Sequence, residues 1–519
     1  MVNDMIYVSP ESEGIGSDKI LKFIELVQKH KINLHSFMFV KSGNIVAEGY
    51  YKPFNADFKH RIYSASKSFV ALAVGKAIGD GKLKLTDKLV DLFPEYPVAE
   101  DRAWLKDTTV EDALMMSVPM FADTYYSRKY KDWAWTFFNI DSDLKPAGTV
   151  FSYNTSATFI LDVLVEKITG MTFLEYLRPV FEKIGVADDI WCVKSPDGYS
   201  WGGSGVLITM RDFAKVGELV MHRGNYKGEQ LLPLDYMTRA TSAMTQNLTE
   251  NFYFQLTTTG YGYQFWINEN GYSLYGMGSQ LVCCFPEKDF MFVCNGDTQS
   301  SGDYCSKFMY DVVRYVIYDE IKDQPLPENE KAYKELTNAL NNLELNNDFG
   351  AFHSDFEKQI HGVKYELEEN KMGWKWFKFE FEGDEGVLHY ENERGEKQIR
   401  FGLGKYVYGT FPETHYYDKQ VDTPANRELD AMFSANWIAE NKILVRNYIT
   451  DTNFGNCFMT FGFKGDEVGL MFKKTAEFFM SEYHGFAGGR KITGFDTDFK
   501  TTNYSVVILS GGVCHTFLI

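Results

Sequence analysis

The sequence predicts an α+β protein with two unlike parts, a mixed part of helices and antiparallel strands followed by an antiparallel β part. Up to about residue 320, segments with apolar residues at helical spacing alternate with short strand-like runs. The stretch 322–331, KDQPLPENEK, is polar and holds two prolines, which is typical of a linker. From about residue 345, apolar residues alternate or run between turn residues, which favours a barrel or a sandwich. A chain of 519 residues is also long for a single core.

The first elements are a helix, a hairpin and a second helix. Residues 17–30 carry apolar positions at helical spacing, with Ser17 as the cap. Residues 35–51 contain two strand-like runs around the turn sequence KSGN, which is the pattern of a β-hairpin. The apolar run 66–83 predicts a helix that ends near Gly79.

The remaining elements follow the same two patterns. Between 94 and 150 the chain is rich in Trp, Tyr, Pro and Asp, and it predicts short elements at most. Strand-like runs then alternate with segments of helical spacing. The predicted helices span 156–169, 210–222, 301–320 and 331–343, and the predicted strands 261–266, 280–285 and 289–295.

The composition excludes several classes of function. Asp and Glu total 71 against 53 Lys and Arg, and the net charge of −18 repels nucleic acid and anionic membrane surfaces. The N-terminus lacks the pattern of a signal peptide, and no apolar run approaches the ~18 residues of a spanning helix. The seven cysteines form no C-x-x-C pair, and none of the 10 histidines has a metal-ligand spacing. We therefore expect a cytoplasmic protein with reduced thiols, no metal and no cofactor.

The segment YSASKSF (63–69) contains a serine followed three positions later by a lysine. Ser64 and Lys67 open an apolar helix, and side chains at i and i+3 of a helical turn point the same way. A serine hydroxyl needs a neighbouring base to attack an acyl carbon. A lysine can be that base when burial or a helix N-terminus lowers its pKa, and the same N-terminus offers N–H groups to an oxyanion. The alternative interpretation is a capping serine beside a solvated lysine.

The pattern S-x-x-K occurs a second time, at Ser142 and Lys145. The residues that follow it directly are Pro-Ala-Gly, which predict a loop. We therefore assign the possible chemistry to the first pair.

Two later segments support a catalytic role for the pair Ser64 and Lys67. Tyr153 lies just before a predicted helix, where a tyrosine can relay a proton to a leaving group. The alternative for Tyr153 is a half-buried structural role. The segment 272–285, YSLYGMGSQLVCCF, is a strand with glycines that would let a substrate approach the backbone. The alternative there is an ordinary hairpin with a bulge.

In this order and spacing, the segments resemble the serine hydrolases of the class C β-lactamase and penicillin-binding-protein type. The closer resemblance, over about residues 8–320, is to the family VIII carboxylesterases. It is carried by SPESEGIGSDKI, HSFMFVKSGNIVAEGYYKPF, YSASKSF, GDGKLKLTDKLVDLFPE, GTVFSYNTSATFIL and GGSGVLITMRDFAKVGELV. It implies a β-lactamase/transpeptidase-like fold, in which a five-stranded antiparallel sheet flanked by helices lies beside a helical lobe. The domains expected are a β-lactamase-like serine hydrolase (1–321), a linker with a helix (322–344) and a C-terminal β domain (345–519).

The resemblance also implies roles for single residues. Ser64 matches the acylated serine, Lys67 the lysine that activates it, and Tyr153 the tyrosine of the Y-x-N motif. The third motif, K-T-G or H-T-G in relatives, falls on Leu274-Tyr275-Gly276, so that the backbone N–H groups of Ser64 and Met277 would form the oxyanion hole. The residues expected to bind substrate are Thr155, Tyr275, Gly276, Trp133 and Trp135, and the alternative for the two tryptophans is structural packing.

Two departures from the family pattern bear on the substrate. Thr155 stands where the family usually has Asn, which alters one polar contact to the substrate or to Lys67. The third motif lacks its Lys or His, the cation that in relatives helps to bind the carboxylate of β-lactam or peptide substrates. These departures favour neutral or bulky esters over β-lactams.

The expected function is therefore that of a serine hydrolase, an esterase that works through an acyl-enzyme on Ser64. Its substrate would be a small-molecule ester, amide or peptide. One alternative is a D-aminopeptidase or amidase, or a weak β-lactamase, because some D-aminopeptidases of this superfamily carry extra β domains. A second alternative is a non-catalytic ligand-binding protein that keeps the fold, which the altered third motif would suit. The natural substrate and the oligomeric state stay open.

Overall fold

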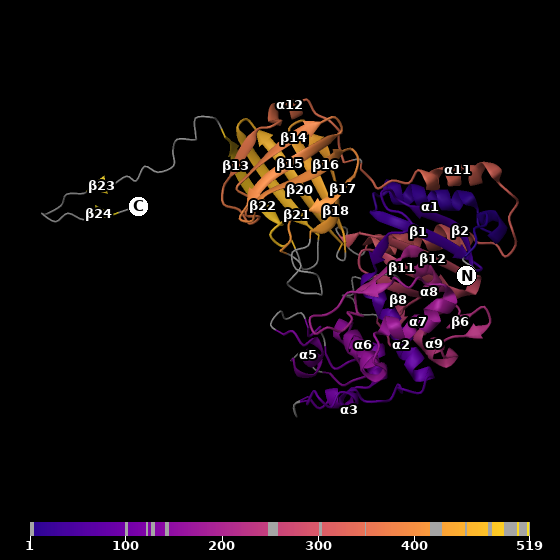
Figure 1. Ribbon diagram of the computed structural model, residues 1–519. Helices are drawn as coiled ribbons and strands as arrows, with labels where there is room; N and C mark the ends of the chain where they lie inside the picture. Colours follow the sequence, from indigo (N-terminus) through magenta and orange to yellow (C-terminus); the bar gives the residue numbers. More distant parts are fainter. Residues whose placement is uncertain are drawn as a thin grey trace.

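The computed structural model consists of a helix-and-sheet part followed by a β-barrel (Figure 1). It describes residues 5–492 apart from 99–101, 121–122, 126–129, 141–144, 248–257, 300–303, 348, 416–427, 452–453 and 476–479, together with 506–507 and 516–517. Buried apolar side chains form two clusters, one in each part. This confirms the predicted α+β class, whereas the predicted domain boundaries stay a prediction.

An antiparallel sheet forms the centre of the N-terminal part. In the described residues it has seven strands in the order β2-β1-β12-β11-β10-β9-β8, against the five that the family resemblance implies. The predicted hairpin is confirmed, and it turns at Ser42 and Gly43, which have φ angles of 53° and 75°. The strands are β1 (Leu34–Lys41), β2 (Asn44–Tyr50), β8 (Thr258–Tyr261), β9 (Trp266–Asn268), β10 (Gly271–Gly276), β11 (Gln280–Phe285) and β12 (Phe290–Gly296).

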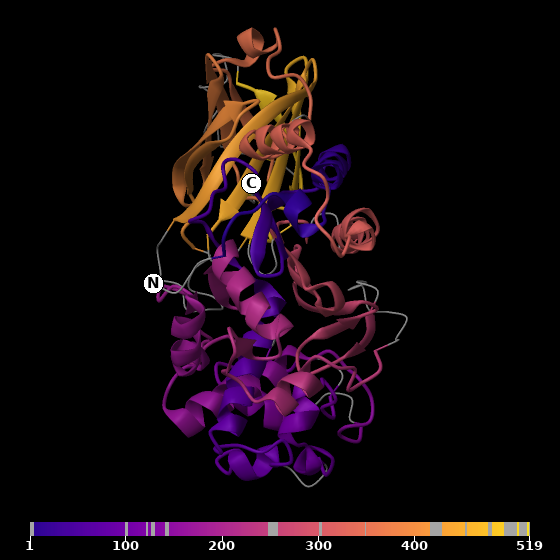
Figure 2. The ribbon, with the colours of Figure 1, turned by 90° about the vertical axis from the view of Figure 1, so that its right-hand side faces the viewer.

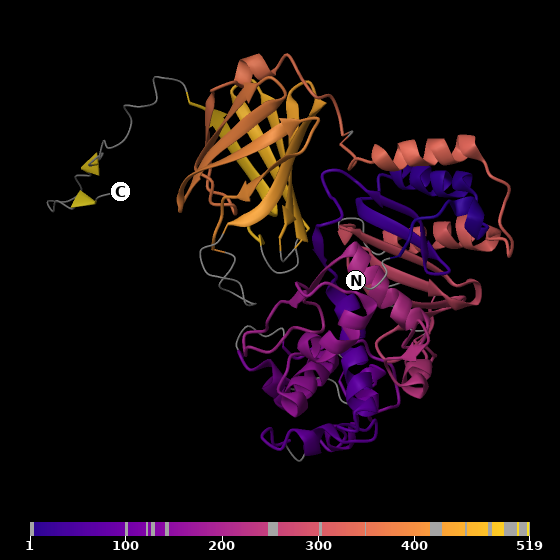
Figure 3. The same ribbon diagram turned by 45° about the vertical axis from the view of Figure 1, so that its right-hand side comes forward.

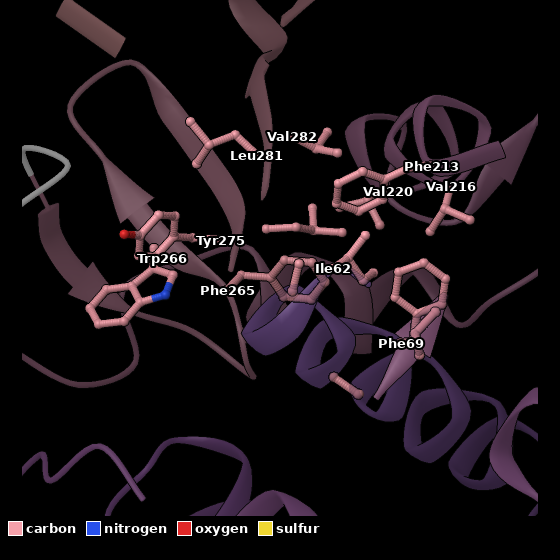
Figure 4. Close-up of a cluster of buried hydrophobic side chains, with 14 of the residues drawn as sticks. Ile62, Phe69, Phe213, Val216, Val220, Phe265, Trp266, Tyr275, Leu281 and Val282 are labelled. Atoms are coloured by element: carbon pink, nitrogen blue, oxygen red, sulfur yellow. The ribbon is translucent and has the colours of Figure 1, made fainter. Parts of the chain in front are cut away.

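Two helices of the N-terminal part are buried on nearly all of their faces. Helix α2 (Ser66–Gly79) buries 11 of its 14 residues, and α6 (Thr155–Thr169) buries its first three turns, as expected for helices that are apolar on every face. Helix α8 (Met210–Met221) packs on β11 and β12, and Figure 4 shows side chains of α2, α8 and β11 in one cluster. The other helices are α1 (Ser17–Lys29), α3 (Leu89–Leu92), α4 (Val110–Leu114), α5 (Trp133–Asn139), α7 (Phe173–Ile184) and α9 (Leu234–Ala240).

Short ladders complete the N-terminal part. One joins β3 (Lys59–Arg61), β5 (Val206–Thr209) and β4 (Trp191–Cys192), and another joins β6 (Asn225–Tyr226) and β7 (Glu229–Gln230). The predicted strand over 261–266 is wrong, because its middle is a turn between β8 and β9 in which Gln264 has a φ of 65°.

The helix predicted over 301–320 is found in three pieces. Helix α10 (Tyr304–Val312) continues into a π-helical turn, Val313–Ile317, and a 3₁₀ turn, Tyr318–Glu320. Helix α11 (Glu330–Asn341) follows the linker and packs against α1. It buries Ala332 and Leu336 on one face and exposes most of the rest, which explains its polar sequence.

The C-terminal part is a closed barrel. In the described residues nine strands form a ring, β16-β15-β14-β13-β22-β21-β20-β19-β18, which closes through parallel pairing of β16 with β18, and β17 pairs on β18 beside it. Burial alternates along β15, so every second side chain fills the interior. The bounds are β13 (Lys364–Leu367), β14 (Trp376–Glu382), β15 (Glu385–Asn392), β16 (Gly395–Leu403), β17 (Val407–Phe411), β18 (Leu429–Ala439), β19 (Lys442–Thr450), β20 (Phe454–Lys464), β21 (Glu467–Lys474) and β22 (Gly485–Lys491).

Of the two architectures that the sequence allowed for this part, the barrel is confirmed. The glycine-rich segment Gly485–Lys491 is a full strand of this barrel, β22, between β13 and β21. The remaining small elements are α12 (Glu357–Ile360), η1 (Pro10–Glu13), η3 (Leu105–Asp107), η4 (Pro286–Lys288), β23 (Val506–Val507) and β24 (Thr516–Phe517).

The barrel packs on the N-terminal part through buried contacts. Figures 2 and 3 show the barrel at one end of the molecule and the helical lobe of α3 and α5 at the other. Met432 and Tyr448 of the barrel belong to the hydrophobic cluster of the N-terminal part. The Tyr408 hydroxyl donates a hydrogen bond to the Pro53 carbonyl at 2.8 Å.

The described part of the chain has neither a membrane-spanning helix nor a cluster of metal-binding side chains. None of its helices is long and apolar enough to cross a membrane. Among the same residues, no group of three or more His, Cys, Asp or Glu side chains could hold a metal ion. The six cysteines that the structure describes are free thiols.

A buried pair of histidines joins β1 to β3. His35 Nδ1 and His60 Nε2 are 3.0 Å apart, and the His35 ring stacks on Phe54 at 3.8 Å. Burial lowers the pKa of both histidines, that of His60 to about 3 and that of His35 well below its ordinary value. The unfolded chain therefore takes up protons on these residues below pH 6.5, whereas the folded chain does not.

We expect acidification to destabilise the fold through this pair. Going from pH 7.5 to pH 5.0, each histidine is expected to lower the free energy of unfolding by about 2 kcal/mol, at ~1.4 kcal/mol per pH unit below the unfolded pKa. Urea unfolding at pH 7.5, 6.0 and 5.0 measures this effect. Because glutamine cannot take up a proton, the free energy of unfolding of His60→Gln should fall less steeply with decreasing pH than that of the wild type. The explanation would be refuted if the free energy of unfolding depended on pH equally in the wild type and in His60→Gln.

Candidate active site

Ser64 lies in a strained turn at the start of α2. The 3₁₀ turn η2 (Tyr63–Ala65) leads directly into the helix, and Tyr63 has a φ of 45°, which is uncommon for a residue other than glycine. Tyr63 and Ala65 are buried, whereas Ser64 is partly exposed. Arg61, fully buried, braces the turn because its guanidinium lies 4.6 Å from the Tyr63 ring centre and its Nε donates to the Ser204 carbonyl at 2.8 Å.

Lys67 points at Ser64 from one helical turn later, as the spacing predicts. Its Nζ lies 3.0 Å from Ser64 Oγ and 2.7 Å from the Gly203 carbonyl oxygen, to which it donates. The residue is 1% exposed. A buried amine held at this distance from a hydroxyl has the geometry that a general base requires.

Tyr153 reaches the same hydroxyl from the start of α6. The helix N-terminus that places it is capped by Asn154, whose Oδ1 accepts from the Ala157 N–H at 3.2 Å, and by the Asp123 carboxylate, which accepts from Ser156 at 3.1 Å. Burial raises the pKa of Tyr153, a hydrogen bond with Ser64 lowers it by less, and the Asp123 charge raises it further. Lys67 Nζ lies 5.0 Å from the Tyr153 ring centre. The phenol is therefore neutral at physiological pH and can donate a proton.

Aromatic side chains hold the Tyr153 ring in place. Trp266 stacks on it at 5.4 Å with an interplanar angle of 25°, and Tyr261 meets it edge-on at 6.3 Å. Both side chains are buried. Their role against Tyr153 depends on the pairing of β8 with β9. No local signal in the sequence indicates it.

A second residue that sequence reasoning missed is Gln264, which ties three helices together. Its backbone carbonyl accepts from Ser68 Oγ of α2 at 2.7 Å, and its Oε1 accepts from Thr158 Oγ1 of α6 at 2.6 Å. Its Nε2 donates to the Leu114 carbonyl at the end of α4 at 2.8 Å. A polar residue inside the apolar run YGYQFW is the signal that could have indicated this role.

Strand β10 approaches the Ser64 turn at the third motif. A Cβ atom on Gly276 would lie 2.0 Å from the Ile62 carbonyl oxygen, so a glycine is required for this contact. Met277 follows in the turn between β10 and β11 and is half-buried. Leu274, at the position of the missing cation, is fully buried in the core, and Tyr275 is 2% exposed beside Trp266 (Figure 4).

The remaining residues predicted to bind substrate differ in exposure. Thr155 packs its methyl group against Gly203, where a Cβ atom would come within 2.4 Å. Trp133 is 7% exposed and stacks on Tyr125 at 4.3 Å. Trp135, on the same helix, is half-exposed. Contact of these three side chains with a substrate stays a prediction. Of the second S-x-x-K, residues 142–144 lie outside the described part of the chain.

The family of this protein follows from comparison with known sequences. The protein-family model described as Beta-lactamase matches residues 22–311. Because the match covers more than half of the chain, the protein belongs to the beta-lactamase family. The resemblance to β-lactamase and penicillin-binding-protein type hydrolases is thereby confirmed, and the closer one to family VIII carboxylesterases stays a prediction.

One curated protein and several solved structures are similar to this chain. The 6-aminohexanoate-dimer hydrolase of Paenarthrobacter ureafaciens is 24% identical over 281 residues, which are 50% of this chain and 71% of that protein. Among solved structures, the octameric penicillin-binding protein homologue from Pyrococcus abyssi is 14% identical with a TM-score of 0.45, covering 91% of this chain and 99% of that one. The D-amino acid amidase from Ochrobactrum anthropi is 16% identical with a TM-score of 0.45, covering 59% and 98%.

The close approach of β10 predicts an intolerance to any side chain at Gly276. We expect Gly276→Ala to lower the free energy of unfolding by about 1–3 kcal/mol, because backbone atoms on both sides of the contact would have to move. The control is Gly469→Ala in the barrel, where an added Cβ meets no atom within 4 Å. Urea midpoints of the two variants test the prediction, which fails if they are equally stable.

Proposed function

We propose that this protein is a serine hydrolase that forms an acyl-enzyme on Ser64, with esters as its main substrate class. The observation that carries the proposal is the convergence on one hydroxyl of Lys67 Nζ at 3.0 Å and the hydrogen-bonded phenol of Tyr153. Nucleophile, base and proton donor within hydrogen-bond reach are what acyl transfer needs. Membership of the beta-lactamase family supports the same reaction class.

In the acylation step, the neutral amine of Lys67 accepts the Ser64 hydroxyl proton while Oγ forms a bond to the acyl carbon. The former carbonyl oxygen takes up the electron pair, and the N–H groups of Ser64 and Met277 stabilise this oxyanion. The bond from the acyl carbon to the leaving oxygen then breaks. Tyr153 gives its phenolic proton to the leaving oxygen and receives the proton held by Lys67.

In the deacylation step, water attacks the acyl-enzyme and gives a proton to Lys67 as its oxygen bonds to the acyl carbon. The ester bond to Ser64 breaks, and the proton returns to Oγ as the carboxylic acid leaves. Because burial raises the pKa of Tyr153, its phenolate is scarce, and this favours Lys67 over Tyr153 as the base in both steps.

The preference for neutral esters rests on the third motif. With Leu274 buried where relatives carry a cation, no charge at that position attracts a substrate carboxylate. A β-lactam or peptide carboxylate would lose the corresponding ion pair. An uncharged ester forms no such ion pair, so the replacement of the cation by Leu274 does not weaken its binding.

An amidase is the second candidate function. It is favoured by the relative named for hydrolysing a dimer of 6-aminohexanoate, since an amino acid dimer joined through its amino and carboxyl groups is an amide. Comparing kcat/KM of the wild type on butyl esters and on D-aminoacyl amides decides between the two candidates. A preference for the amides would displace the esterase proposal, and turnover of either that depends on Ser64 would exclude a non-catalytic binding protein.

The nucleophile is tested with a fluorophosphonate probe and intact-mass measurement. We expect one probe adduct on the wild type, no adduct on Ser64→Ala, and a loss in kcat/KM on p-nitrophenyl butyrate of about 10³-fold or more. The matched control is Ser142→Ala, which alters the second S-x-x-K and should label like the wild type. Absence of label on the folded wild type, or equal labelling of Ser64→Ala, would refute the mechanism.

The role of Tyr153 is tested by the choice of leaving group. A p-nitrophenolate leaves without a proton, whereas an alkoxide needs one, so Tyr153→Phe should lower kcat/KM by about 10²–10⁴-fold on butyl esters but much less on p-nitrophenyl esters. Lys67→Met should lower both equally, because each reaction needs the base. If Tyr153→Phe lowers both equally as well, Tyr153 does not protonate the leaving group.

A further inference from the structure

The barrel contacts the N-terminal part directly behind the candidate oxyanion turn. Asp297, which follows β12, is 2% exposed, and its carboxylate accepts a hydrogen bond from the side-chain amide of Asn456 on barrel strand β20. Asn456 is 1% exposed. Gln299 Nε2 donates to the other carboxylate oxygen of Asp297 at 3.1 Å. A buried, directional bond of this kind fixes the position of both backbones.

The segment that Asp297 anchors lies against the turn that carries Met277. The Thr298 N–H donates to the Gly278 carbonyl at 3.3 Å, and the hydroxyls of Thr298 and Ser279 are 2.7 Å apart. A Cβ atom on Gly278 would lie 3.4 Å from the Gln299 side chain. The residues 297–299 are therefore in contact with residues 278–279 through both backbone and side chains.

The turn needs such support because its backbone is unusual. Gly278 and Ser279 have φ angles of 78° and 74°, and the second is uncommon for a residue other than glycine. The Gln280 amide supports the turn from the strand side by donating to the carbonyls of Met277 and Gly278, each at 3.3 Å, and of Gly296 at 2.6 Å. On its other side the turn is supported by residues 297–299. Because Asp297 is hydrogen-bonded to Asn456, this support depends on the barrel.

We propose that Asp297 and Asn456 are positioning residues through which the C-terminal barrel sets the conformation of the turn that presents the Met277 N–H. The proposal rests on the serine hydrolase function proposed above. It makes oxyanion stabilisation in the N-terminal part depend on a hydrogen bond supplied by the barrel. An oxyanion donor acts on the transition state, so a displaced turn should lower kcat and leave KM nearly unchanged.

The test exchanges donor and acceptor across the contact. Burial raises the pKa of Asp297 to about 6, so the assays are run well above that value, at about pH 8.5. There Asn456→Asp removes the amide donor and sets two carboxylates against each other, and we expect about a 10–100-fold fall in kcat on p-nitrophenyl butyrate and in the rate of fluorophosphonate labelling. In the double variant Asp297→Asn with Asn456→Asp the bond is restored in the opposite direction, and both rates should return to within about threefold of the wild type. If the contact only stabilised the fold, kcat would not fall selectively while KM stayed unchanged.

The matched control is Tyr408→Phe, which removes a different hydrogen bond between the barrel and the N-terminal part, that to Pro53. Its kcat and labelling rate should equal those of the wild type. If Asn456→Asp does not fold, Asn456→Ala replaces it, with about a 10-fold fall in kcat expected at unchanged KM.

Two outcomes overturn the proposal. One is a folded Asn456→Asp or Asn456→Ala with wild-type kcat and labelling rate, and the other is a double variant that stays as slow as the single one. These outcomes differ from a failure of the hydrolase proposal, in which the wild type itself would remain unlabelled at Ser64. Thermal unfolding of every variant separates a local change in the turn from a general loss of structure.

Discussion

The candidate site depends on the contact between strand β10 and the turn before α2. Gly276 brings the strand within a distance of the Ile62 carbonyl that leaves no room for a side chain. This contact places the end of the central sheet beside the Ser64 hydroxyl, while the strained backbone at Tyr63 lifts Ser64 out of an otherwise buried turn. This close approach brings the end of β10 next to the turn that leads into α2.

Burial then decides how the titratable groups behave. Lys67 and Tyr153 share one hydroxyl in a region covered by Trp266 and Tyr261, so their hydrogen bonds have few water molecules to compete with. Burial also raises the pKa of Tyr153, and this makes the phenol a donor rather than a base. In the mechanism proposed above, this packing leaves the Lys67 amine to take protons and the Tyr153 phenol to pass them on.

The barrel is joined to this machinery rather than attached beside it. Met432 and Tyr448 contribute to the core of the N-terminal part, and Asn456 bonds to Asp297 next to the turn that carries Met277. An appended β domain that shares a core and a buried hydrogen bond with its neighbour cannot shift without disturbing both. The closing of the barrel by β16 and β18 also removes the free edges that a separate sheet would leave exposed.

The amino-acid sequence by itself determined the class of fold and the candidate residues for the chemistry proposed above. Helical spacing sets the distance from Ser64 to Lys67, the run of alternating apolar residues indicates the β domain, and the position before a helix singles out Tyr153. Only the tertiary structure decided how these groups meet and what supports them. The stacking of Trp266 on Tyr153, the three-helix link at Gln264 and the bond from Asn456 to Asp297 join segments far apart in the chain. Such contacts arise from packing between elements, which local patterns of residues do not encode, and the split of the predicted 261–266 strand has the same cause.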